Sequence, residues 1–291
     1  MEDGQPPRGR ALQEVPSCHS RLALNLVRVP SSKHSGVIDA ERERDVKPVE
    51  RIAYVAGGLL VLSGLVHLAV LVVGGASWDG PVSLRKPMTF GLSFGLTLIN
   101  VTLIASAVSV SARARTLLIG SFATACVVET LLVSMQAWRG VPSHFNMETP
   151  FDAAVAQTLA VGGLVLVLVI VTLTVLAFRT RTPRTPGLLH AIRAGLVALV
   201  GAQVAGAAMI ATGVRLVVGG DPALAYATGG WLKPVHAVLM HGILVLPLLA
   251  WAISTAGWTE RTQARVLRAG IIAYAMVAVG AAAGVLIQTV P

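Results

Sequence analysis

This chain has few charged residues. Asp, Glu, Lys and Arg make up 13% of its 291 residues, whereas hydrophobic residues make up 54% and the mean hydropathy is +0.73. Soluble domains carry about 25% charged residues. A chain of this length with so few charges cannot coat a water-soluble globule, so the composition excludes a soluble protein and predicts several membrane spans.

Cysteine and lysine are also scarce. Of the two cysteines, Cys18 lies in a polar stretch and Cys126 in an apolar run, which excludes a disulfide framework and a Cys-x-x-Cys metal motif. The four lysines all lie outside the last apolar run, so no retinal Schiff base can form there. The chain also lacks a phosphate-binding loop and a dinucleotide fingerprint.

Seven long apolar runs follow residue 50, each near the length of about 20 residues that a bilayer-crossing helix needs. They cover residues 52–74, 88–110, 117–138, 153–178, 188–213, 235–254 and 266–290. Because backbone groups must be paired inside lipid, the runs predict helices, and the lack of period-two alternation excludes barrel strands. The predicted fold is all-α, a polytopic bundle of seven transmembrane helices over residues 51–291. Residues 1–50, rich in proline and charge, predict a disordered cytoplasmic tail.

The distribution of Lys and Arg predicts the orientation. With alternating sides, 18 of these residues fall with the N-terminus and 5 on the other side, and the split without the tail is still 9 to 5. The positive-inside rule then puts the N-terminus in the cytoplasm and the C-terminus outside. Trp78, Trp138 and Trp231 mark the outer boundary as an aromatic belt. We therefore expect a multi-pass protein of the bacterial inner membrane, with the lipid bilayer as its first partner. Despite the net charge of +9, no nucleic-acid partner is expected.

Ionisable residues within the apolar runs are the first candidates for a site, because each costs about 2.5–3.5 kcal/mol to insert. They are His67, Glu129, His236 and His241. At about 1.5 Å per residue, His67, Glu129 and His241 lie roughly 10, 14 and 9 Å from the outer ends of their runs. All three then share the outer half of a core about 30 Å thick. Glu129 is the strongest candidate, since a carboxylate at this depth needs a partner, a proton or a water-filled cavity.

The outer segments carry further candidates, namely Asp79, Arg85, Lys86, His144 and Asn146. Loops above a polar pocket are a common place for specific chemistry. Other interpretations remain open: the two basic side chains can snorkel to the headgroups, and Asp79 can pair with either of them. The segment from Thr149 to Asp152 has the pattern of a helix start, with threonine as N-cap and proline after it.

Three outer motifs occur together. They are Trp78-x-Gly80-Pro81-x-Ser83-x-Arg85-Lys86-Pro87, then Ser143-His144-Phe145-Asn146-x-x-Thr149-Pro150-Phe151-Asp152, and a histidine early in the sixth run. In combination, from about residue 50 to the end, they resemble a group of uncharacterised bacterial multi-pass membrane proteins. The resemblance implies that the outer residues belong together, but it implies no activity, cofactor or catalytic residue.

Four functions remain open from the sequence. The favoured one is binding or proton-coupled transport of a small solute, with Glu129 as the titrating group. The second is a membrane redox protein that holds haem or a metal between His67 and His241 or His236. His236 and His241 diverge by about 140° on a helix, so they do not ligate one metal together. A membrane-embedded hydrolase and a non-catalytic sensor complete the set. Seven spans do not halve evenly and no inverted repeat is recognised, which argues against a standard secondary transporter fold.

Overall fold

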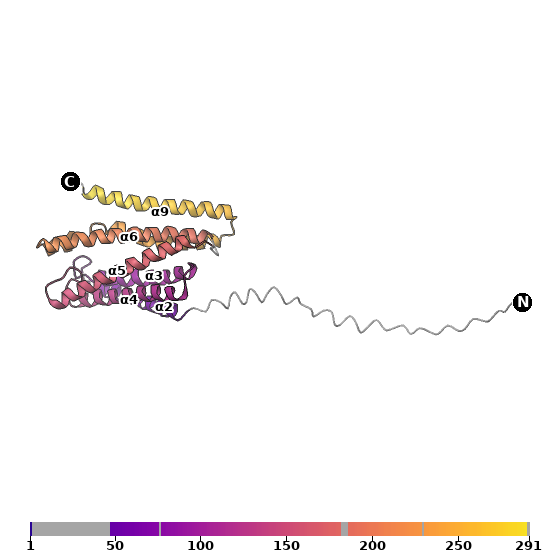
Figure 1. The fold of residues 1–291 in the computed structure, drawn as a ribbon. Helices are drawn as coiled ribbons and strands as arrows, with labels where there is room; N and C mark the ends of the chain where they lie inside the picture. The colour runs from indigo at the N-terminus through magenta and orange to yellow at the C-terminus, as the bar shows by residue number, and fades with distance from the viewer. Residues whose placement is uncertain (2–46, 76, 182–185, 229, 290–291) are drawn as a thin grey trace. The chain divides into compact units, whose positions relative to one another are not determined.

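The computed structural model describes residues 1, 47–75, 77–181, 186–228 and 230–289, and within these ranges the regular structure is helical (Figure 1). The helices are α2 (Pro48–Val73), α3 (Arg85–Ala107), α4 (Ala112–Trp138), α5 (Pro150–Arg179), α6 (Pro186–Val218), α7 (Pro222–Thr228), α8 (Lys233–Ser254) and α9 (Glu260–Thr289). All except the short α7 are long and apolar enough to cross a membrane, which makes seven candidate spans in the described part of the chain. The predicted all-α, seven-span fold is confirmed.

The first span begins at Pro48, three residues before the predicted boundary. Proline is favourable in a first helical turn, and the backbone N–H of Lys47 donates a hydrogen bond of 3.0 Å to the Glu50 carboxylate. Residues 48–50 therefore belong to α2. The rest of the predicted tail, residues 2–46, lies outside the described residues.

Close backbone contact joins α2 to α3. A Cβ added at Gly91 would lie 2.6 Å from the backbone nitrogen of Gly64, and one at Gly95 would lie 2.6 Å from the carbonyl oxygen of Gly57. Small residues at such positions allow the van der Waals packing that holds helices together in lipid. The Gly91-x-x-x-Gly95 pattern thus makes a helix contact.

Three short sequence patterns each occur twice in the chain, and they follow one another in the same order both times. The segment Leu-Val-Val-Gly-Gly ends at Gly75 and again at Gly220, and Lys-Pro begins the following long helix at residues 86–87 and 233–234. The pattern Ala-Arg-x-Leu-x-x-Gly then occurs at residues 114–120 and 264–270. The three pairs of segments are separated by 145, 147 and 150 residues, in the same order. This order defines two units, α2–α3–α4 and α6–α8–α9, with α5 between them.

The packing follows the same division. In each unit the first two long helices contact each other most extensively, and the third packs against both of them. A Cβ at Gly57 of α2 would lie 3.0 Å from the carbonyl oxygen of Gly95, and one at Gly195 of α6 would lie 2.9 Å from that of Gly242. Gly95 and Gly242 occupy the same position after Lys-Pro. Because α5 crosses once between the units, their helices run in the same directions, so the repeat is parallel rather than inverted.

Three connecting segments gather at one end of the helices. We call this the three-loop end, formed by the described residues of 74–84, 139–149 and 219–232. The His144 ring lies 5.9 Å from that of Phe90 on α3, and the Phe145 ring covers Gly213 on α6. At the opposite end, Arg115 lies 3.5 Å from the carboxylate of Glu50. The second of these segments therefore packs against α3 and α6 at this end of the bundle.

Candidate functional site

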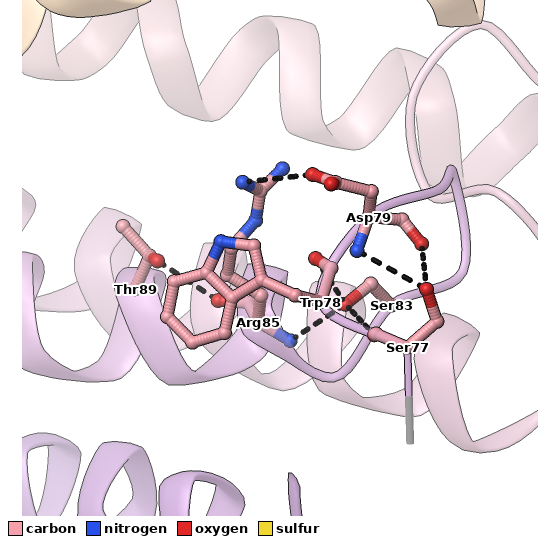
Figure 2. A network of polar contacts seen from close by, with 6 residues as sticks. All are labelled: Ser77, Trp78, Asp79, Ser83, Arg85 and Thr89. Carbon is pink, nitrogen blue, oxygen red and sulfur yellow. Dashed lines mark hydrogen bonds and ion pairs between the residues drawn. The ribbon is translucent and has the colours of Figure 1, made fainter. Parts of the chain in front are cut away.

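The first motif folds onto itself at the start of α3 (Figure 2). The Ser83 hydroxyl donates to the carbonyl oxygens of Ser77 and Trp78 at 2.8 and 2.9 Å, and it accepts from the backbone N–H of Arg85 at 3.2 Å. The Arg85 guanidinium lies 5.6 Å from the Trp78 ring centre and 3.4 Å from the Asp79 carboxylate. Asp79 thus pairs with Arg85 rather than with Lys86; the Asp79 side chain is exposed and that of Arg85 is half-buried.

The second motif starts α5 with a buried network. The backbone N–H of Asp152 donates to the Thr149 hydroxyl at 3.1 Å, which confirms the predicted N-cap. The Asp152 carboxylate accepts from the Thr149 hydroxyl at 2.6 Å, from the Gln136 amide at 2.9 Å and from the Arg139 guanidinium at 2.6 Å. The guanidinium also lies 4.8 Å from the Phe151 ring centre. Asp152 therefore fastens α4 to α5.

Residues 143–146 of the same motif pack inward. The His144 Nδ1 lies 3.0 Å from the Ser143 hydroxyl. Phe145 adopts the left-handed conformation at φ 62°, which is unusual for a side chain of this size. Asn146 is 1% exposed; its side-chain oxygen accepts from the Glu148 backbone, while among the described residues its amide nitrogen has no hydrogen-bond partner. The loop is held by packing and still has one unused buried donor.

Protonation of His144 should weaken the folded protein. Burial, and then the charge of Lys86, hold the pKa of His144 well below its ordinary value of 6.5. The folded state therefore disfavours the proton, so the stability from neutral His144 is present above pH 6.5 and is lost as the pH falls towards the folded-state pKa. The loss is at most about 1.4 kcal/mol per pH unit. Thermal unfolding in detergent between pH 7.5 and 5 should show this decline, and His144→Asn should flatten it. An equal decline in the variant would assign the pH dependence to another group.

Glu129 lies inside the bundle, 3% exposed, on the face of α4 that meets α5. Its carboxylate rests against the backbone of Gly162 and Gly163, and a Cβ at Gly162 would collide with Oε1. Among the described residues Oε1 has no hydrogen-bond partner. The opposite charge that acts on it is that of Lys86 at the start of α3. Glu129 is thus shielded from lipid and has one cation within electrostatic reach.

His67 joins α2 to α4. Its Nδ1 lies 2.8 Å from the Ser63 carbonyl oxygen, which only accepts, so Nδ1 carries the proton. Its Nε2 then accepts from the indole N–H of Trp138 at 3.0 Å. Both ring nitrogens are used in this arrangement, so His67 has no lone pair available for haem or a metal.

His236 and His241 have separate environments on α8. The His236 Nδ1 donates to the Ala202 carbonyl oxygen of α6 at 2.7 Å, which joins α6 and α8. The His241 Nδ1 donates to the Ala237 carbonyl oxygen of its own helix at 2.6 Å. His241 lines a groove of about 300 Å³ between α3 and α8, together with Met88, Thr89, Leu92, Ser93, Leu96, Thr97, Met240 and Leu244.

The groups that the structure brings together differ in part from the predicted set. Lys86 is within electrostatic reach of Glu129 on α4, His144 in the second motif and Lys233 on α8. Lys233 was not among the predicted candidates, although its Lys-Pro start matches that of Lys86. Residues 47–75, 77–181, 186–228 and 230–289 contain no group of three or more His, Cys, Asp or Glu side chains that could hold a metal ion.

The fold defines a class, that of a multi-pass membrane protein. Comparison of the chain with models of protein families, with curated proteins and with solved structures found no match. The side chains of the three-loop end and of the α3–α8 groove are therefore the features that indicate function.

Proposed function

We propose that this protein binds a small solute at the three-loop end and couples that binding to protonation of Glu129, as a proton-coupled carrier does. The three-loop end would face the outside of a bacterial inner membrane, as the distribution of Lys and Arg predicts. Lys86 and His144 would complete the polar site, and Asp79 with Arg85 would form its rim.

The observation that carries this proposal is the environment of Glu129. A carboxylate that only holds a fold together is normally hydrogen-bonded when it is buried. Asp152 is such a residue, since its carboxylate accepts from three side chains. Glu129 instead has an oxygen without a partner and a half-buried lysine nearby. A group of this kind suits reversible protonation better than structural support.

Infrared difference spectroscopy tests whether Glu129 takes up a proton. The purified full-length chain in detergent should show, in an acid-minus-neutral spectrum, the carbonyl stretching band of a protonated carboxyl group shielded from water. Glu129→Gln should remove this band, because glutamine keeps the size of the side chain but cannot titrate. Circular dichroism should show unchanged helix content.

Glu148 provides the matched control. It is an exposed glutamate at the three-loop end, so Glu148→Gln should keep the shielded band. A band that persists in Glu129→Gln, or that is absent from the wild type, would contradict the role of Glu129 as the titrating group.

A further inference from the structure

The groove between α3 and α8 is apolar except for a few hydrogen-bonding side chains. Ser93 and Thr97 lie one helical turn apart on its α3 wall, and His241 lies on its α8 wall. Counting from the Lys-Pro pairs, Ser93 corresponds to Met240 and Thr97 to Leu244, so these hydroxyl groups belong to the first unit only. None of the nine lining residues, all in the described part of the chain, is Asp, Glu, Lys or Arg. The groove therefore suits an uncharged ligand.

The hydroxyl groups of Ser93 and Thr97 are not used within the fold. A serine or threonine inside a helix commonly donates to the carbonyl oxygen four residues earlier. Thr89 (Figure 2) and Thr102 do so, each at 2.8 Å. Within the residues that the structure describes, neither Ser93 nor Thr97 makes a side-chain hydrogen bond. Thr97 is only 5% exposed and lines the groove, so a partner for its hydroxyl group has to come from the groove.

His241 adds an acceptor on the opposite wall. Its Nδ1 donates to the Ala237 carbonyl oxygen, so in the neutral ring Nε2 carries a lone pair, and that nitrogen has no partner among the described residues. Ser93 lies eight residues into α3 and His241 eight residues into α8, which puts both roughly 12 Å from the three-loop end. Hydrocarbon offers no partner at this depth, so unpaired polar groups there are costly.

These donors and acceptors match one hydroxyl group of a ligand. Its O–H can donate to Nε2 of His241, and its oxygen can accept from the hydroxyl group of Ser93 or Thr97. Apart from Thr89, the remaining lining side chains are leucine and methionine, which suit a hydrocarbon chain. The volume of about 300 Å³ is at the lower end of small-molecule sites and equals about ten water molecules at ~30 Å³ each.

We infer that the α3–α8 groove binds a neutral amphiphile whose hydroxyl head is held by Ser93, Thr97 and His241 and whose hydrocarbon body lies against the leucine and methionine side chains. Aliphatic alcohols and phenols share this chemistry. The site goes beyond the proposed function, since Glu129 does not line the groove.

Photolabelling of the purified full-length chain in detergent with a diazirine derivative of octan-1-ol tests the site. Mass spectrometry should place the label on groove residues of both helices, such as Met88, Leu92 and Met240. Excess octan-1-ol should remove the label at about ten-fold lower concentration than methyl heptyl ether, which has the same length but cannot donate a hydrogen bond. Octanoate should compete no better than the ether, because its charge would be buried without a partner.

Three results would overturn the site. They are a label spread evenly over the spans, equal competition by octan-1-ol and the ether, and stronger competition by octanoate than by octan-1-ol. The first would mean that the groove only takes up hydrocarbon like the rest of the lipid-facing surface. The other two would mean that no hydroxyl head is recognised.

Single substitutions test each hydrogen-bonding group. Ser93→Ala, Thr97→Val and His241→Phe should each weaken competition by octan-1-ol about three- to ten-fold and leave competition by the ether nearly unchanged. Thr172→Val is the matched control, because this exposed hydroxyl group on α5 donates to its own helix at 2.7 Å. It should behave like the wild type. Unchanged competition by octan-1-ol in all three groove variants would contradict the hydroxyl head.

Two further arms locate and identify the ligand. Ser93→Met gives the first unit the residue of the second and fills the groove without changing its charge, so the groove label should disappear. A label that persists at Met240 would contradict the groove as the seat of the ligand. If 4-ethylphenol, which has as many non-hydrogen atoms as octan-1-ol, displaces the label at lower concentration, the occupant has a phenolic head. The reverse order identifies an aliphatic alcohol.

Discussion

Replacing Gly91 by alanine should destabilise the protein by about 1–3 kcal/mol, because overpacking a tight contact costs this much. The added Cβ would lie 2.6–2.8 Å from three atoms of the α2 backbone, at Leu60 and Gly64. Backbone atoms cannot rotate away as a side chain can, so α2 and α3 must separate along their length. Unfolding of the purified protein by denaturant in micelles should show the loss, and a lower thermal midpoint should accompany it.

Gly58 is the matched control, since a Cβ there meets no atom within 4 Å. Gly58→Ala should leave stability unchanged or raise it by up to about 1 kcal/mol, the difference in helix propensity. Equal losses in the two variants would show that the effect does not depend on the contact at Gly91, and would contradict the close approach of α2 and α3.

Replacing Asp152 by asparagine should lower the thermal midpoint by about 4 °C or more, because a buried carboxylate that accepts from three side chains loses its charge and at least one hydrogen bond. Asparagine has nearly the same shape but presents an NH₂ group where the carboxylate accepted hydrogen bonds. The Arg139 guanidinium would lose its carboxylate at 2.6 Å, and either Gln136 or Thr149 would lose an acceptor.

Asp79 offers a direct comparison, because it also pairs with an arginine at the same end of the molecule. Its side chain is 85% exposed and lies 3.4 Å from Arg85, whereas that of Asp152 is 3% exposed. Exposed pairs contribute little, so Asp79→Asn should shift the midpoint by about 2 °C or less. Similar shifts in both variants would mean that burial does not strengthen the Asp152 network.

The spans could be predicted because bilayer thickness and backbone pairing fix both their length and their composition. Their ends could not, since caps and polar turns extend helices past the apolar run; α6 reaches Val218, five residues beyond the predicted end. The helix α7 has only seven residues, so a search for apolar runs of bilayer length does not find it. The repeat could not be predicted from the number of spans, because seven spans do not divide into two equal halves. Two units of three spans emerge only when α5 is counted separately as the helix that connects them.

The site could be predicted only in outline. The cost of burying a carboxylate singled out Glu129, and its burial against α5 is observed. The histidines were less predictable, because their hydrogen bonds depend on which carbonyl or indole the tertiary fold brings near. His67 is the clearest example, since its partner Trp138 is 71 residues away. The orientation of the bundle in the membrane stays a prediction.

The single helix α5 decides the direction of the second unit. A unit of three spans ends on the side of the membrane opposite to where it began, so a second unit joined directly to the first would be inserted upside down. The one added span reverses this, so α3 and α8 run in the same direction and each gives one wall of the groove between them.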